Sequence, residues 1–245
     1  MKFLVGLGLS AVLLTGCGGP SASVSPSVSP SGTSSDCAAV QQDWAASGIS
    51  SDWSGANLVN CDLSGANLLE GKFVGADLSG ADLSGAYLVQ ADLTNANLTG
   101  ANLTGVFSMS LQLDGANLTD ANLTGADLES GYFSGANFTR ANLSGTNLTY
   151  ANFSGAIMAD ANLSSLYLPA VNFSGANLNG ANLNDVTGFD IIFAGANLTN
   201  ANLSGAELFG ADLNGANLTN ANLTNVSYCE ATMPDGTQNN DNCTP

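Results

Sequence analysis

The chain has 245 residues and a formal net charge of −17 at pH 7, with three Lys or Arg residues against 20 Asp or Glu and no histidine. The missing histidine excludes acid–base chemistry and metal ligation by imidazole. The acidic balance predicts no nucleic-acid partner and repulsion from anionic lipid headgroups, while a basic partner is allowed.

Residues 1–16 predict an export signal. Lys2 precedes an apolar run, residues 3–14, that is too short to span a membrane as a mature helix. The run ends in Leu14-Thr15-Gly16-Cys17, which resembles the lipobox of a bacterial lipoprotein signal peptide. The resemblance implies lipidation of Cys17 and an extracytoplasmic protein anchored in the bacterial cell envelope, with the membrane leaflet left open. The alternative is an ordinary signal peptide that is cleaved near a cysteine.

Residues 17–35 are small or polar and carry no charge, so we expect a flexible tether. Residues 36–48 predict a short helix, with Ser35 or Asp36 as N-cap and Gly48 as terminator. This helix would cap the first turn of the following repeat with an apolar stripe, because the open end of a solenoid exposes unpaired backbone groups. The residues of the expected stripe are Ala38, Val40 and Trp44.

Residues 49–233 are a five-residue repeat with an apolar residue at every fifth position. From position 58 to position 233 only Ser108 and Gly188 break this rule. Ala usually stands two residues before the apolar position, and Asn or Asp stands between them. Since residues two apart in an extended segment point to one side, we expect Ala and Leu to face inward and Asn or Asp to face outward. The two remaining positions, rich in Gly, Ser, Thr and Asn, would turn the chain.

The exceptions to the repeat indicate how many units make one coil. Replacements of the Ala fall mainly in two columns with a spacing of twenty residues, and five of the six Phe at the main apolar position share one such column. These are Phe73, Phe133, Phe153, Phe173 and Phe193. Four units per coil explain this sorting, whereas three or five would scatter it. The sequence therefore predicts a solenoid with a twenty-residue turn.

The repeat resembles the pentapeptide-repeat family, whose A-[DN]-L-x-x motif is matched by Ala96-Asn97-Leu98, Ala116-Asn117-Leu118 and Ala216-Asn217-Leu218. The resemblance implies an all-β fold, a right-handed quadrilateral β-helix, here of about nine four-sided coils. Residues 234–245, which begin with the turn Pro234-Asp235-Gly236, would form a C-terminal capping tail.

Four cysteines remain after Cys17, two near each end of the repeat. Pairing Cys37 with Cys61 and Cys229 with Cys243 avoids a link across the whole rod, and an exported protein can form both disulfides. The alternative is buried free thiols, because Cys61 occupies an inward Ala-type position.

Large apolar residues stand at a few outward positions where Asn or Asp is the rule. They are Tyr87, Phe107, Tyr132, Tyr167 and Ile192, with Met109, Phe189 and Phe209 on nearby turn positions. Two interpretations are open. They form a surface for a protein partner or for self-association, or local repacking turns residues such as Phe107 inward.

The sequence favours a structural or binding module rather than an enzyme. No base accompanies the many Ser and Thr, and the carboxylates would lie on an open convex surface, so we expect no catalytic residue, cofactor, metal site or small-molecule substrate. Some pentapeptide-repeat proteins mimic DNA and occupy type II topoisomerases, an alternative that the export signal disfavours. A third hypothesis is an ice-binding solenoid with Thr and Asn rows.

Overall fold

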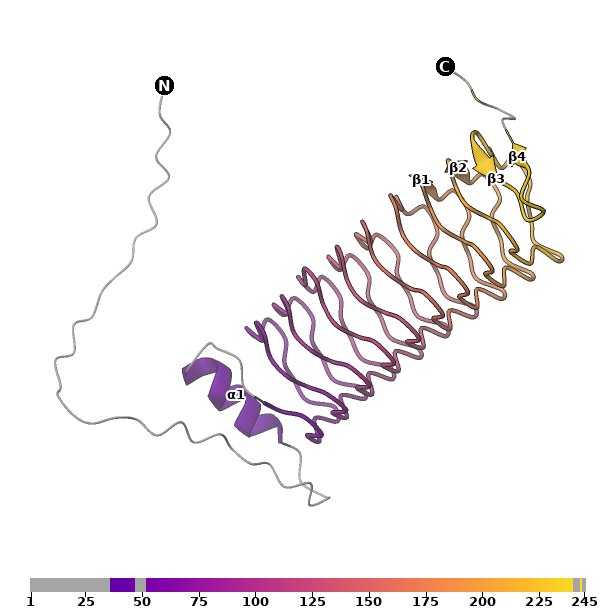
Figure 1. Ribbon diagram of the computed structural model, residues 1–245. Helices are drawn as coiled ribbons and strands as arrows, with labels where there is room; N and C mark the ends of the chain where they lie inside the picture. The colour runs from indigo at the N-terminus through magenta and orange to yellow at the C-terminus, as the bar shows by residue number, and fades with distance from the viewer. Residues whose placement is uncertain (1–35, 47–51, 240–242, 244–245) are drawn as a thin grey trace, which may run out of the picture.

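The computed structural model describes residues 36–46, 52–239 and 243, and the chain forms a rod of stacked coils (Figure 1). The predicted signal peptide, Cys17 and the tether lie outside the described residues, as does the predicted helix terminator Gly48. Within the described part, no helix has the length and apolar character needed to cross a membrane.

Each coil takes twenty residues. Parallel bridges join outward residues twenty positions apart, such as Asn97 with Asn117 and Asn117 with Asn137. The Asn97 N–H donates to the carbonyl of Ala76 at 2.9 Å, and the Leu98 N–H donates to the carbonyl of Asn117 at 2.7 Å. The predicted twenty-residue turn is therefore confirmed.

The coil has four faces, which we number in chain order by their outward residues at intervals of twenty. Face 1 runs from Asp52 to Thr232, face 2 from Asn57 to Asn217, face 3 from Asp62 to Asn222 and face 4 from Asn67 to Ser227. Most of the pairing consists of single bridges. On face 4, strand β1 (Thr187–Phe189) pairs in parallel with strand β2 (Glu207–Phe209).

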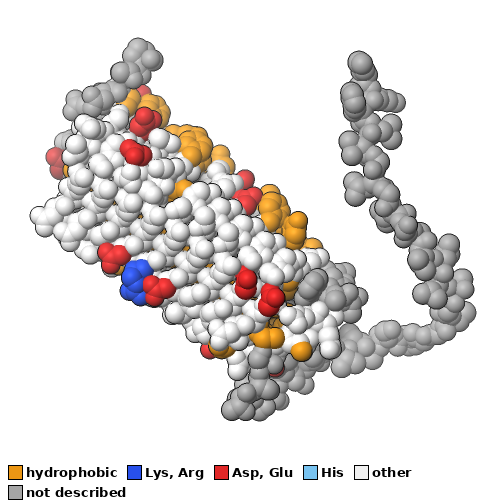
Figure 2. Space-filling view, turned by 180° about the vertical axis from the view of Figure 1, so that it is seen from behind, with side chains coloured by type: hydrophobic (Ala, Val, Ile, Leu, Met, Phe, Trp, Pro, Cys, Tyr) orange, Lys and Arg blue, Asp and Glu red, His pale blue; other side chains and the backbone are white. Residues whose placement is uncertain are grey.

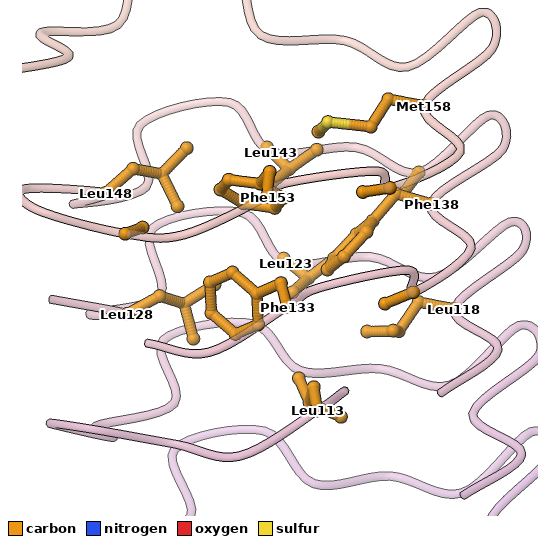
Figure 3. Close-up of a cluster of buried hydrophobic side chains, with 14 of the residues drawn as sticks. Leu113, Leu118, Leu123, Leu128, Phe133, Phe138, Leu143, Leu148, Phe153 and Met158 are labelled. Carbon is orange, nitrogen blue, oxygen red and sulfur yellow. The ribbon is translucent and has the colours of Figure 1, made fainter. Parts of the chain in front are cut away.

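Ala and Leu fill the interior as expected. Ala96 and Leu98 are buried, while Asn97 between them is partly exposed. The phenylalanines predicted to share a column lie above one another, as Figure 3 shows for Phe133 and Phe153. The ring centroids are 4.7 Å apart for Phe133 and Phe153 and 5.3 Å apart for Phe153 and Phe173. Burying each large side chain stabilises the rod by roughly 1.5–3 kcal/mol before the entropy cost is counted.

The preference for Asn or Asp at the outward position has a structural cause. The Asn97 Oδ1 accepts hydrogen bonds from the Thr99 backbone N–H at 3.2 Å and from the Thr99 hydroxyl at 2.7 Å. The Asn97 amide group also donates to Asp77 Oδ1 in the preceding coil at 2.9 Å. An outward Asp can therefore close the turn of its own coil, and an Asn can do so while also joining two coils.

The second residue of each corner has a positive φ, which explains why Gly is frequent there. Gly115 has a φ of 67°, whereas Asn95, one coil earlier in the same column, has a φ of 58°. The Asn95 side chain lies over Gly115, and its Oδ1 occupies the space that a Cβ on Gly115 would need. With the Asn95 side chain in this position there is no room for a side chain at residue 115, although other corner columns hold side chains in consecutive coils, such as Asp120 and Arg140.

The N-terminal edge of the first described coil contacts helix α1 (Cys37–Ala46). Asp36 donates its N–H to the carbonyl of Asn57 at 2.7 Å and accepts the Asn57 N–H on its carboxylate at 2.9 Å. The Gln41 side-chain amide donates to the carbonyl of Asp62 at 2.7 Å. Asp36 and Gln41 therefore occupy the pairing positions that a preceding coil would otherwise take.

The predicted apolar stripe of this helix is wrong in one residue. Val40 is buried, but Ala38 is exposed. Residues two apart on a helix point about 200° away from each other, so these two cannot face the same coil. The side chain of Trp44 lies outside the described part.

Two disulfides lie at the ends of the rod. Cys37 is bonded to Cys61 with a Cα–Cα distance of 5.4 Å, and Cys229 is bonded to Cys243 with a Cα–Cα distance of 4.8 Å. These are the two pairs that the sequence predicts. At the C-terminal end, β3 (Ala231–Thr232) pairs antiparallel with β4 (Gln238–Asn239).

Candidate functional site

Exposed apolar side chains gather on face 4 and on the corner that follows it. Eight of the eleven large apolar side chains exposed in the described part lie there. They are Leu69, Tyr87, Phe107, Met109, Tyr150, Tyr167, Phe189 and Phe209. We call these eight residues the face 4 stripe. Hydrophobic side chains gathered along one edge of the rod are visible in Figure 2.

The repeat positions these side chains outward. Tyr87 and Phe107 occupy the outward position of successive coils, and their ring centroids are 6.0 Å apart. Tyr167 is in contact with Phe189 on the adjacent corner, with ring centroids 6.3 Å apart. Such tilted aromatic pairs contribute roughly 0.5–1.5 kcal/mol each.

Local repacking does not turn the aromatic residues inward. Val106 and Ser108 are both buried, and the Ser108 hydroxyl donates to the carbonyl of Asp127 at 2.9 Å. Phe107 nevertheless stays outward and is 41% exposed, and Phe189 is 38% exposed. The small residue at the main apolar position therefore does not bring the neighbouring aromatic ring into the interior.

Two of the predicted surface residues, Tyr132 and Ile192, lie on face 1 and outside the face 4 stripe. Tyr132 is exposed on face 1, whereas Ile192 on the same face is only partly exposed. Ile192 does occupy the outward position that the sequence predicts, but it offers less exposed surface than Tyr132. Sequence reasoning missed Tyr150, which is 59% exposed at a corner position where small and polar residues are common. The signal that could have identified it is a large aromatic residue in the corner column that follows face 4, where Gln90 and Ser110 also stand.

Face 4 and its corner are acidic and carry no base. Six carboxylates lie there among the aromatic rings, and no Lys or Arg does. The acidic residues are Glu70, Asp127, Glu129, Asp190, Glu207 and Glu230. The Arg140 guanidinium lies on another corner, where it donates to both carboxylate oxygens of Asp120 at 2.7 Å. These hydrogen bonds lower the pKa of Asp120.

Two open grooves lie along face 4. One, of about 570 Å³, is near the C-terminal disulfide, and Glu207 and Phe209 contribute to its wall. The other, of about 300 Å³, lies midway along the rod beside Tyr167.

The hydroxyl of the half-buried Tyr228 has no hydrogen-bond partner, and burial raises its pKa. Within the described residues, no group of three or more His, Cys, Asp or Glu side chains could hold a metal ion.

The comparisons with known proteins agree on one family. The family model described as pentapeptide repeats matches residues 49–80, 72–107, 112–149, 146–185 and 192–226. A search of curated proteins found no match.

Three solved structures are similar to this chain. HetL, a pentapeptide repeat protein involved in heterocyst differentiation regulation in the cyanobacterium Nostoc, is 30% identical, with coverage of 82% of this chain and 98% of HetL and a TM-score of 0.44. The fluoroquinolone resistance protein QnrB1 is 19% identical, with coverage of 74% of this chain and 82% of QnrB1 and a TM-score of 0.36.

The third is a pentapeptide repeat protein of the Arabidopsis thaliana thylakoid lumen, which is 35% identical. That match covers 46% of this chain and 68% of the plant protein, with a TM-score of 0.17. Because the family model covers more than half of the chain, the chain belongs to the pentapeptide-repeat family.

Proposed function

We propose that this protein is a lipid-anchored, extracytoplasmic binding module of the bacterial cell envelope that engages a protein partner through the face 4 stripe and performs no catalysis. The observation that carries the proposal is the grouping of exposed aromatic side chains on one face of a rod whose other faces are mostly polar. Rings such as Tyr87 and Phe107 can bury large areas with little loss of conformational entropy.

Two ends of the chain complete the proposed organisation. Helix α1 would cap the N-terminal edge through Asp36 and Gln41, and residues 234–245 would cap the other end. The Leu14–Cys17 motif would supply the anchor. Labelling of the wild-type protein with a palmitate analogue, lost in Cys17→Ser, tests the anchor separately from the binding surface. Equal labelling of both proteins would contradict lipidation of Cys17.

The binding surface is tested by pull-down after crosslinking. We expect Tyr87→Asn, Phe107→Asn and Tyr167→Asn together to abolish partner capture while the circular dichroism spectrum is unchanged. The matched control replaces Tyr132 and Ile157 with Asn, since both are exposed but lie on faces 1 and 2. Equal capture by the two variants would remove face 4 as the binding surface.

The structure weighs against the two other functions considered. Neutral Asn residues such as Asn97 are more common at the outward positions than Asp residues such as Asp77, so negative charge is sparse rather than continuous as on DNA. Rows of Thr on faces 2 and 3, such as Thr99 and Thr104, direct their hydroxyls into hydrogen bonds with Asn, which leaves them poorly suited to order ice. Assays of supercoiling inhibition and thermal hysteresis should both be negative.

A further inference from the structure

The β-ladder of face 4 is interrupted at one place. Bridges join Asp127 with Asn147 and Tyr167 with Thr187, but none joins Asn147 with Tyr167. On the other three faces, every pair of outward residues twenty apart between positions 52 and 232 is bridged. The interruption is therefore a local feature of two coils.

Three backbone donors lose their ladder bonds at this point. They are the N–H groups of Gly145, Leu148 and Tyr167, whose equivalents one coil earlier all donate at 2.9 Å. The carbonyls of Thr146 and Tyr167, which would accept two of these bonds, are also left without a backbone donor. The ladder closes again where Tyr150 donates its N–H to the carbonyl of Pro169 at 3.1 Å.

The interruption coincides with two replacements of Ala in the inward column of face 4. Thr146 and Leu166 both stand where Ala is usual, one above the other, and both are buried. The Thr146 hydroxyl is fixed by hydrogen bonds to the carbonyls of Leu143 at 2.6 Å and Leu123 at 3.1 Å. Bulk alone does not open a ladder, since Val171 and Ile191 stand one above the other on face 1 beside an intact ladder. What sets the face 4 pair apart is Leu166 above a Thr146 side chain that is held in place by its hydroxyl.

The next pair in this column differs from Thr146 and Leu166 at the main apolar position. Leu166 also lies below Val186, but there Gly188 replaces the large residue at the main apolar position and the ladder is intact. Between Thr146 and Leu166 no such small residue compensates, since Leu148 and Leu168 are both present and buried.

The interruption opens into the groove beside Tyr167. This groove, of about 300 Å³, is lined by Gly145, Thr146, Asn147, Ser165, Leu166 and Tyr167. The exposed side chain of Tyr167 contributes to its wall, and Tyr150 follows on the adjacent corner. The next coil toward the N-terminus presents Asp127 and Glu129, and face 4 has no Lys or Arg.

We propose that this groove docks an extended cationic segment of a protein partner. The inference rests on the proposed role of face 4 as a binding surface and assigns the chemistry of what binds there. An extended peptide presents every second side chain on the same side, so that its Lys or Arg residues can face the groove together. Its Lys or Arg side chains lie over the tyrosine rings and beside the carboxylates of Asp127 and Glu129.

The test uses a labelled peptide of alternating Arg and Val or Thr, and the same peptide with Glu in place of Arg. By fluorescence anisotropy at low salt, the wild-type protein should bind the Arg peptide at least tenfold more tightly than the Glu peptide. Leu166→Ala, which lets the two coils close, should weaken binding of the Arg peptide at least tenfold. Val186→Ala is the matched control, since it lies in the same column beside an intact ladder, and should change binding less than twofold.

Amide hydrogen exchange provides a readout that does not need the peptide. The N–H groups of Gly145, Leu148 and Tyr167 should exchange at least tenfold faster than their equivalents in the preceding coil. Both the Arg peptide and Leu166→Ala should slow them. Thr146→Ala provides a second closing variant if Leu166→Ala does not fold.

Three results would overturn the proposal. They are protection of these three amides in the free wild-type protein, equal or absent binding of the two peptides, and tight binding by a variant whose amides show that the gap has closed. The pull-down with substitutions at Tyr87, Phe107 and Tyr167 reports separately on the face 4 stripe. Its failure would remove the proposed function, whereas failure of the peptide test alone would remove only the cationic segment.

Discussion

The packing of Asn95 against Gly115 predicts an energetic coupling between residues twenty apart in sequence. Gly115→Ala should be destabilising for two reasons. An alanine at a φ of 67° costs about 1–2 kcal/mol relative to glycine. Its Cβ would also overlap Asn95 Oδ1, so that the Asn95 side chain must leave its rotamer at a further cost of roughly 0.5–1.5 kcal/mol.

Gly100 provides the matched control. Its φ of 65° imposes the same backbone cost, but nothing lies within 4 Å of the position that a Cβ would occupy. Gly115→Ala should therefore lower the free energy of unfolding more than Gly100→Ala by about 0.5–1.5 kcal/mol. The measurement is urea denaturation followed by circular dichroism, with the m-values compared to ensure that the same transition is observed.

A double-mutant cycle then isolates the contact. In the background of Asn95→Gly, the excess cost of Gly115→Ala should disappear, because the overlapping atom is gone and the corner keeps its positive φ. Equal destabilisation by Gly115→Ala and Gly100→Ala, or an unchanged excess after Asn95→Gly, would refute the stacking of these two corners.

Three further changes have expected outcomes. Asn97→Asp removes a donated hydrogen bond and places a carboxylate beside Asp77, so the free energy of unfolding should fall by about 0.5–1.5 kcal/mol at pH 7. Urea denaturation measures the change, and a variant as stable as the wild type contradicts this. Tyr228→Phe removes a buried hydroxyl without a partner and should raise the thermal midpoint, whereas a marked fall would mean that the hydroxyl is bonded. Cys37→Ser breaks the disulfide to Cys61 and should cost about 2–4 kcal/mol, with reducing agent destabilising the wild type and having a smaller effect on the variant.

The core and the register could be predicted from sequence because the repeat constrains them in every unit. Each inward position is buried by the same geometry, so the chemical identity of Ala96 or Leu98 is informative by itself. Columns such as that of Phe133 and Phe153 then give the number of units per coil. The outward position of Tyr87 and Phe107 follows from the same alternation.

Features that depend on contacts between particular coils could not be predicted in this way. The exposure of Ile192 depends on its neighbours, and the orientation of Ala38 depends on how the helix lies on the first coil. The interruption at Tyr167 coincides with the vertical adjacency of Thr146 and Leu166, whose other contacts along this column leave the ladder intact. A column-by-column comparison of volumes in consecutive coils would have indicated the conflict, but not whether the ladder or the side chains would yield.

The twenty-residue coil is tested most directly by engineered disulfides on face 2. Asn117 and Asn137 are paired across the ladder, and paired strands lie about 4.8 Å apart, within the Cα–Cα range of a disulfide. Replacing both with Cys should give a crosslink under mild oxidation, identified by mass spectrometry after pepsin digestion. Replacing Asn117 and Asn142, which are twenty-five residues apart on different faces, should give none. A crosslink between positions 117 and 142, without one between 117 and 137, would contradict the four-unit coil on which the faces, the stripe and the groove depend.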